Sequence, residues 1–156
     1  MSGLTSSFFY LTFTATLLYV AYFLPRQEPK ETSLVLYVHD HLTGDNKSAI
    51  TVAGNNGPEI ESKAIGRVQG MYLNSKQDGK GLYLAFSVIF TDGEFKGSSL
   101  EIQGSDIYSP KERGFGVGSG MGYFRFAKGY GLMKTEFMDL PNLIAVIKLS
   151  ITVKHY

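Results

Sequence analysis

The stretch LVLYVHDHL at residues 34–42 holds two histidines and an aspartate in a strand-like segment. Alternation places His39 and His41 on one face and Asp40 on the other. Two histidines with this spacing, joined by the distant His155, could hold a metal ion through three imidazoles. Hydrogen-bonded histidines on a sheet surface are the alternative, which we favour. We therefore expect no metal and no other cofactor.

Asp40 shares its predicted face with apolar residues, namely Leu34, Leu36 and Val38. A carboxylate in such surroundings is costly unless it is satisfied, and the environment favours the neutral acid, which can donate a proton. A structural hydrogen bond at the end of a strand accounts for the same residue equally well. Both interpretations stay open at this point.

The segment GFGVGSGMGYFRFAKGYG, residues 114–131, repeats glycine at every second position from 114 to 122. Neither phosphate-binding glycine pattern occurs in it, and no helix pattern follows that could bind an anion. Alternation places these glycines on one face of a strand, where another strand or another subunit can approach closely. We expect Gly116, Gly118 and Gly120 to serve such packing between subunits.

Most of the remaining chain alternates apolar and polar residues with the period of a β-strand. The closing segment AVIKLSITVKHY, residues 145–156, shows it most clearly, and segments 34–42, 66–74, 81–90 and 98–104 are similar. Turn signals such as Gln77-Asp78-Gly79-Lys80 and Asp92-Gly93 separate them, whereas 43–65 has the composition of a long connection. The pattern predicts an all-β antiparallel sandwich or barrel.

Composition narrows the functional classes. Charged residues make up 19% of the chain and the formal net charge is +1, which disfavours a nucleic-acid partner. There is no cysteine, which excludes disulfides and thiolate chemistry.

The first 24 residues form a separate, almost uncharged segment. Residues 8–24, FFYLTFTATLLYVAYFL, are typical of a secretory signal, and a retained membrane anchor or a buried first element are the alternatives. We predict a signal peptide or membrane anchor at 1–24, a linker at 25–33 and one domain at 34–156. Asn46 begins a glycosylation sequon that export would make usable.

Several long blocks resemble the plant dirigent protein family, in order and at family spacing. They are LYVHDHLTGDN, GRVQGMYL, LAFSVIFTDGEFKGSSLEIQG, FGVGSGMGYFRFAKGYG and VKHY. The resemblance implies an eight-stranded antiparallel up-and-down barrel of the allene-oxide-cyclase-like type, a homotrimer, and secretion to the apoplast. It also implies a small phenolic ligand, either a monolignol radical or a quinone methide, supplied by a separate laccase or peroxidase.

Block matching to the family indicates four candidate site residues: Asp40, Tyr72, Asp106 and Arg113. An acid or a phenol in a dry barrel interior can protonate or hydrogen-bond the carbonyl oxygen of a quinone methide and so activate it, while the wall selects the attacked face. Arg113 can hold Asp106 or anchor a polar substituent of the ligand.

The chain departs from the family in two places. The disulfide cysteines of one lignan-forming subgroup are absent, and between AITVAG and GPEIESKAIGRVQG a further strand of the family is missing. We therefore expect seven strands. The neighbours of the missing strand would then pair in parallel through 43–65, or the barrel would stay open on one side.

The resemblance predicts a protein that directs the regio- and stereoselective coupling of phenoxy radicals or quinone methides in lignan-type phenylpropanoid biosynthesis without oxidising them. Two alternatives remain. One is a dehydrative cyclase of the pterocarpan-synthase type, and the other is a binding or cell-wall structural protein without catalysis.

Overall fold

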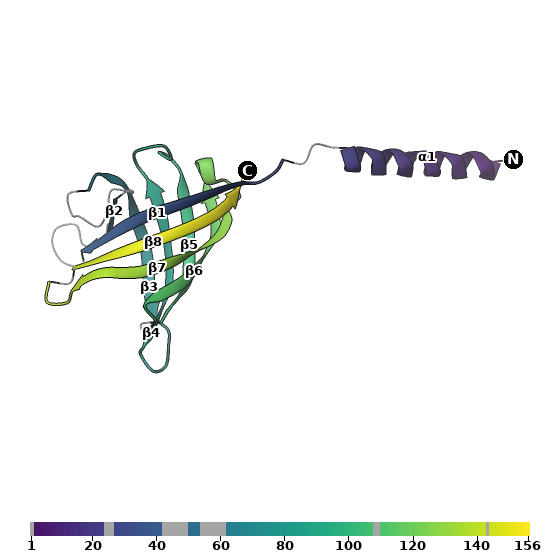
Figure 1. The fold of residues 1–156 in the computed structure, drawn as a ribbon. Coiled ribbons are helices and arrows are strands. Elements are labelled where there is room, and N and C mark those ends of the chain that lie inside the picture. The colour runs from purple at the N-terminus through teal and green to yellow at the C-terminus, as the bar shows by residue number, and fades with distance from the viewer. Residues whose placement is uncertain (1, 24–26, 42–49, 54–61, 108–109, 143) are drawn as a thin grey trace.

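The computed structural model describes residues 2–23, 27–41, 50–53, 62–107, 110–142 and 144–156. It consists of an N-terminal α-helix, α1 (Ser2–Phe23), and a β-barrel that includes a short 3-10 helix, η1 (Gly122–Phe124). The helix α1 stands apart from the barrel in Figure 1. Large apolar side chains of α1, such as Phe8 and Tyr22, are exposed. Within the described residues, no helix combines the length and apolar character needed to cross a membrane.

Eight antiparallel strands form the closed barrel, in sequence order, and β1 pairs with β8 to complete it. They are β1 (Lys30–His41), β2 (Ile50–Ala53), β3 (Ala64–Asn74), β4 (Gly81–Phe90), β5 (Ser99–Ile107), β6 (Glu112–Met121), β7 (Lys128–Asp139) and β8 (Ile144–His155). The expected all-β antiparallel barrel is confirmed.

The expected number of strands needs a correction. Seven strands are long, as predicted, but the four-residue β2 lies inside the segment 43–65 that we had read as a connection. It pairs with β1 through Val38 and with β3 through Gly66, both antiparallel. A shortened strand is therefore enough to keep every neighbour antiparallel, so neither the parallel pairing nor the open side is found.

The start of β1 differs from the expectation in a smaller way. We had assigned 25–33 to a linker, but β1 begins at Lys30, and Glu31 and Thr32 pair with Lys154 and Val153 of β8. The long β8 offers backbone partners to this segment, which local composition does not reveal.

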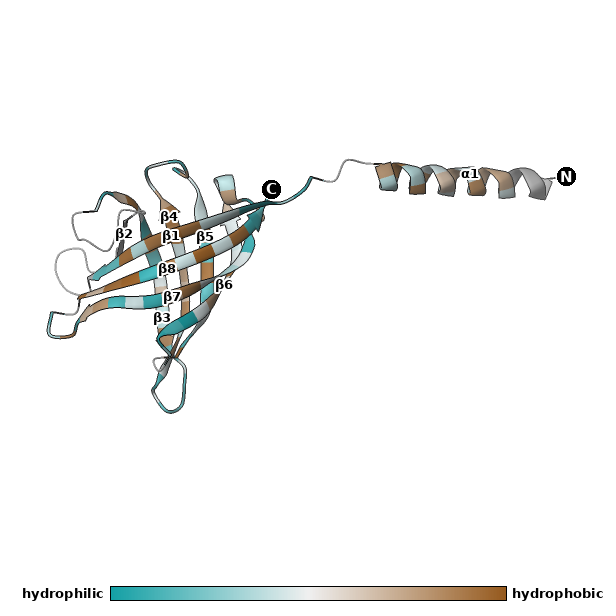
Figure 2. Ribbon diagram, in the orientation of Figure 1, coloured by the Kyte–Doolittle hydropathy of each residue, from teal (hydrophilic) through white to brown (hydrophobic). Residues whose placement is uncertain are grey.

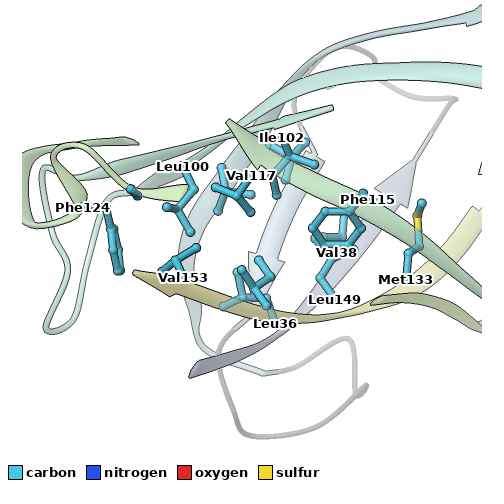
Figure 3. Close-up of a cluster of buried hydrophobic side chains, with 14 of the residues drawn as sticks. Leu36, Val38, Leu100, Ile102, Phe115, Val117, Phe124, Met133, Leu149 and Val153 are labelled. Carbon is cyan, nitrogen blue, oxygen red and sulfur yellow. The ribbon is translucent and has the colours of Figure 1, made fainter. Parts of the chain in front are cut away.

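Alternating side chains fill the barrel. Most inward positions of the long strands are apolar, and outward positions are mostly polar, as the banded colouring of β8 in Figure 2 shows. Figure 3 shows inward side chains from β1, β5, β6, β7 and β8 meeting in the core, including Leu36, Val117 and Leu149. Burial of these side chains stabilises the barrel by roughly 1.5–3 kcal/mol each.

An aromatic plug closes one end of the barrel, which we call the plugged end. It consists of Phe90, Phe95, Tyr123, Phe124 and His155, with ring centroids 4.8–5.6 Å apart from neighbour to neighbour. Phe124 and His155 are almost completely buried, and the His155 Nε2 atom lies 2.9 Å from Thr32 Oγ1. These rings pack at the end of the barrel where β4 and β8 finish and β1 begins.

The glycine-rich segment forms β6 and the start of β7, but its glycines do not share one face. The pairing of β6 with β5 shifts register between Ser119 and Val117, which leaves Gly118 as an extra residue, a β-bulge. Gly116 therefore faces outward, whereas Gly120 is turned inward and is buried against Phe124. The prediction of a single glycine face was wrong because alternation cannot reveal a bulge.

Candidate functional site

The four predicted site residues lie at the same end of the barrel, opposite the plug. In an up-and-down barrel all odd-numbered strands run the same way, so β1, β3 and β5 finish at one end and β6 begins there. Asp40, Tyr72 and Asp106 come within two residues of these strand ends, and Arg113 is the second residue of β6. We call this the polar end.

Asp106 and Arg113 form an ion pair inside the polar end. The Arg113 Nε atom lies 2.8 Å from Asp106 Oδ1, and the two side chains are only 12% and 13% exposed. The contact lacks the alignment of a hydrogen bond, so both atoms are buried without a hydrogen-bond partner among the described residues. The two groups are therefore held together mainly by their opposite charges.

Thr135 of β7 completes this cluster, and the sequence analysis missed it. The Arg113 Nη2 atom donates a hydrogen bond to Thr135 Oγ1 at 2.9 Å. Thr135 follows the buried Met133 by two residues, so alternation could have indicated an inward hydroxyl. The guanidinium is thus held between a carboxylate and a hydroxyl, which fixes its direction.

Asp40 occupies the inward side of β1, as predicted. It follows Leu36 and Val38, which are buried, and pairs with Ala145 of β8 while being only partly buried itself. Tyr72 occupies an inward position of β3 opposite the buried Leu84, but its side chain is 54% exposed at the rim. The phenol of Tyr72 is therefore accessible to solvent at the rim of the barrel.

The histidines cannot form one metal site. His39 pairs with Val146, whereas His155 pairs with Lys30 nine residues earlier on β1, about 30 Å away at the rise of an extended strand. The side chain of His41 lies outside the described residues, as does Asn46 of the sequon. Within the described part of the chain, no three potential metal ligands lie together.

A hollow of about 700 Å³ lies on the other side of the wall, over the outward positions of β3, β4, β5 and β6. Its lining includes Gln69, Ser87, Glu101 and Gln103 but none of the four predicted site residues. Glu101 accepts hydrogen bonds from the hydroxyls of Ser87 and Ser99. The hollow and the polar end are therefore two separate candidate sites, one on the outside of the wall and one among inward side chains.

Known proteins resemble this chain along most of its length. The family model described as "Dirigent-like protein" matches residues 55–154. Pterocarpan synthase 1 of Glycyrrhiza echinata is 35% identical, with 83% of this chain and 81% of that protein covered. Dirigent protein 21 of Arabidopsis thaliana is 32% identical, with 84% and 81% covered.

Solved structures agree with the sequence relatives. The pterocarpan synthase dirigent protein GePTS1 is 31% identical with a TM-score of 0.75, and the match covers 85% of this chain and 89% of that one. The pterocarpan synthase dirigent protein PsPTS1 is 32% identical with a TM-score of 0.75, and the match covers 84% of this chain and 99% of that one.

The sequence alignments also indicate that this chain lacks residues that a relative has. The alignment with the Glycyrrhiza echinata protein runs over 152 positions, more than the 83% of this chain that it covers can supply. The excess corresponds to residues that the relative has and this chain lacks, in keeping with the four-residue β2. Because its sequence matches the family model and its barrel matches solved dirigent structures, the chain belongs to the dirigent protein family.

Proposed function

We propose that the protein binds a small phenolic intermediate at the polar end and directs its regio- and stereoselective coupling, while a separate laccase or peroxidase performs the oxidation. The observation that carries the proposal is the Asp106–Arg113–Thr135 cluster, a charged and nearly buried group inside a dirigent-family barrel. Such a cluster can bind a phenolic oxygen and orient the ring against the wall.

The ion pair assigns different roles to the two carboxyl groups. Asp106, held by its ion pair with Arg113, is placed to accept a hydrogen bond or a proton from the phenol. Asp40, which follows the buried Leu36 and Val38 on the inward side of β1, is the candidate proton donor to the carbonyl oxygen of a quinone methide. Tyr72 can donate a hydrogen bond at the rim.

A dehydrative cyclase is the second candidate, because pterocarpan synthases are among the relatives and solved structures that match. In this reaction Asp40 protonates the hydroxyl group that leaves as water, and Asp106 takes the proton of the phenol that closes the ring. One carbon–oxygen bond breaks, another forms, and no oxidant is needed.

One experiment separates the two candidates. Purified protein is incubated with a preformed isoflavanol without any oxidase, and in parallel with a laccase and a panel of monolignols, and the products are resolved by chiral chromatography. Ring closure in the first reaction supports the cyclase, whereas an enantiomeric excess only in the second supports directed coupling. Ligand binding with neither product would instead support the binding or wall-structural role.

We further propose that the barrel assembles as a homotrimer through the outward face of β3–β6. This face carries exposed apolar side chains beside the hollow, and it offers room at Gly116 and Gly118, where an added Cβ would meet nothing closer than 3.7 Å. The exposed apolar residues are Met71, Leu73, Tyr83 and Ile107. Apolar patches with small residues are typical of subunit contacts.

We also propose that the protein is secreted. Secretion to the apoplast through the segment 1–24 would bring the protein to the compartment in which phenols are oxidised, and would make Asn46 available for glycosylation. Mass spectrometry of the protein purified from secreting plant cells tests both points, by the mass of the new N-terminus and of any glycan.

A further inference from the structure

The strand β7 contains a β-bulge near the polar end. Its pairing with β8 shifts register between Thr135 and Phe137, which leaves Glu136 as an extra residue. In a regular strand, alternation from the inward Thr135 would turn Phe137 into the barrel. With the bulge, Phe137 faces outward and Met138 takes the next inward position of β7.

The partners on β8 agree with these two directions. Met138 lies opposite Ala145, two residues before Ile147, which packs against the core. Phe137 lies opposite Val146, which alternation places on the outer side of the wall. The side chains of Phe137 and Met138 are 53% and 55% exposed. A methionine, rather than a phenylalanine, therefore lines the inner rim of the polar end.

An ion pair on the outer surface spans the bulge. Lys134 Nζ donates to both carboxylate oxygens of Glu136 at 2.8 Å, and the two side chains are 31% and 27% exposed. Because Glu136 is the extra residue, this contact joins it to the regular part of β7. Bulges are common beside active sites, where they redirect a side chain. The side chain that this bulge redirects is that of Met138.

Met138 lies in one row with the candidate proton donor Asp40. Ala145 of β8 is the partner of both, opposite Met138 of β7 on one side and opposite Asp40 of β1 on the other. Two strand spacings separate Met138 from Asp40, which places their Cα atoms about 10 Å apart. In this row the methyl group of Ala145 is the only side chain between a thioether and a carboxyl group.

Such a row suits the ring of a phenol. The thioether of methionine makes favourable contacts with aromatic rings, and its unbranched side chain adapts to rings that carry different substituents. A ring placed over Ala145 would direct its oxygen at Asp40. The next inward residue of β7 is Thr135, which holds Arg113 by a hydrogen bond, so a second polar group of the ligand would lie near that cluster.

We propose that Met138 is a specificity-determining residue: the aromatic ring of the ligand lies over Ala145, in contact with the Met138 thioether, with its oxygen facing Asp40. The inference rests on the proposed function, because it places the ring of the phenolic intermediate within the polar end. It applies equally to directed coupling and to dehydrative ring closure, since both reactions require an oriented ring.

The contact is tested by NMR of protein labelled with ¹³C at the methionine methyl groups. The chain has five methionines, and the signal missing in Met138→Leu identifies Met138. Addition of a preformed isoflavanol or of coniferyl alcohol, without any oxidase, should move the Met138 signal upfield through the ring current. The signal of Met121, an exposed residue at the plugged end, is the internal control and should not move.

Calorimetry with the same two phenols measures how much the contact contributes. Met138→Ala should weaken binding about three- to tenfold, and Met138→Leu, which keeps the apolar volume, should weaken it less. Ala145→Ile fills the space between Met138 and Asp40 and should weaken binding roughly tenfold or more. Phe137→Ala is the matched control, because it removes a larger apolar side chain from the outward side of the same bulge and should leave the affinity unchanged.

The outcomes separate this inference from the proposed function. Unchanged affinity in Met138→Ala, an equal loss in Phe137→Ala, or an unshifted Met138 signal in the saturated protein would overturn the placement of the ring. Binding of the phenols by the wild-type protein would still support the proposed function in each of these cases. If the wild-type protein bound neither phenol, the proposed function would fail, and the inference with it.

Discussion

Arg113 Nε lies 2.8 Å from Asp106 Oδ1 inside the polar end of the barrel, where both side chains are nearly buried. The two residues come from β5 and β6 and enclose the connection between these strands. A charged pair in such a place is expensive to desolvate and contributes little net stability. Its location at the open end of a dirigent barrel favours a role in binding a ligand.

Asp106→Asn should lower both stability and product selectivity. The substitution keeps the shape but leaves the Arg113 charge nearly buried and uncompensated, which we expect to cost about 2 kcal/mol of unfolding free energy. Urea unfolding and chiral product analysis measure the two effects. Asp92→Asn is the matched control: Asp92 pairs with Lys63 on the exposed surface, so this variant should lose far less stability than Asp106→Asn and leave product selectivity unchanged. Unaltered enantiomeric excess in Asp106→Asn would refute its role.

Thr135→Val should loosen Arg113 without removing its charge. The valine keeps the volume but cannot accept the hydrogen bond from Arg113 Nη2, so we expect a loss of about 1 kcal/mol and a lower enantiomeric excess. Thr135→Ser restores the hydroxyl and should restore the product ratio. A serine variant no better than the valine variant would show that the hydroxyl is not what matters.

Gly131→Ala should destabilise the barrel core. An added Cβ at Gly131 would contact the ring of Phe115, which lies over this glycine, and the resulting overpacking should cost about 1–3 kcal/mol. Gly114→Ala is the control on the neighbouring strand, since nothing lies within 4 Å of its added Cβ. Thermal unfolding of the two variants should therefore diverge, and equal melting temperatures would contradict this packing.

Gly116→Val and Gly118→Val should weaken the proposed trimer more than ligand binding, because both positions face outward with room for a neighbour. Gly120→Val should instead disrupt folding, because its Cβ would meet the backbone oxygen of Phe124. Sedimentation velocity gives the assembly state and circular dichroism the fold. A monomeric wild-type protein would rule out the trimer itself.

Stability should fall in acid and stay level near neutrality. Hydrogen bonds from Lys76, Lys63 and Lys134 lower the pKa values of Asp78, Asp92 and Glu136 below their ordinary 3.8, 3.8 and 4.5. A carboxyl group whose pKa is lower in the folded than in the unfolded protein stabilises the fold at pH values above its unfolded-state pKa. This contribution is lost as the pH falls through the folded-state pKa.

Stability should also fall at high pH because of Lys134. The Glu136 carboxylate raises the pKa of Lys134 above its ordinary value of 10.5. Its contribution is present below that value and is lost as pH rises through the raised pKa. Urea midpoints should thus be flat from about pH 5 to 9 and decline below about pH 4. Because these pairs are exposed, high salt should flatten the acid decline, and an equally steep decline in high salt would implicate other groups.

Local sequence was enough to determine the strands and their turns. Alternation in AVIKLSITVKHY predicted the buried Leu149, Ile151 and Val153 of β8, and both Gly79 and Gly93 take the positive φ values that their turn signals required. The inward side of Asp40 followed from the same period. The family blocks located Asp106 and Arg113, and the structure brings these two together.

The tertiary structure decided what depends on partners distant in the sequence. Residues 50–53 form a strand that pairs with β1 on one side and β3 on the other. Their β-branched sequence ITVA suits a strand, but the glycines, asparagines and proline at 54–58 led us to assign the whole segment to a connection. The bulge at Gly118 reflects the register of β5 against β6, and Thr135 reaches Arg113 only because β7 lies beside β6. Strand pairing joins segments that are far apart in the chain. A local pattern therefore predicts which side of the sheet a residue faces, but it does not predict which residue lies beside it on the next strand.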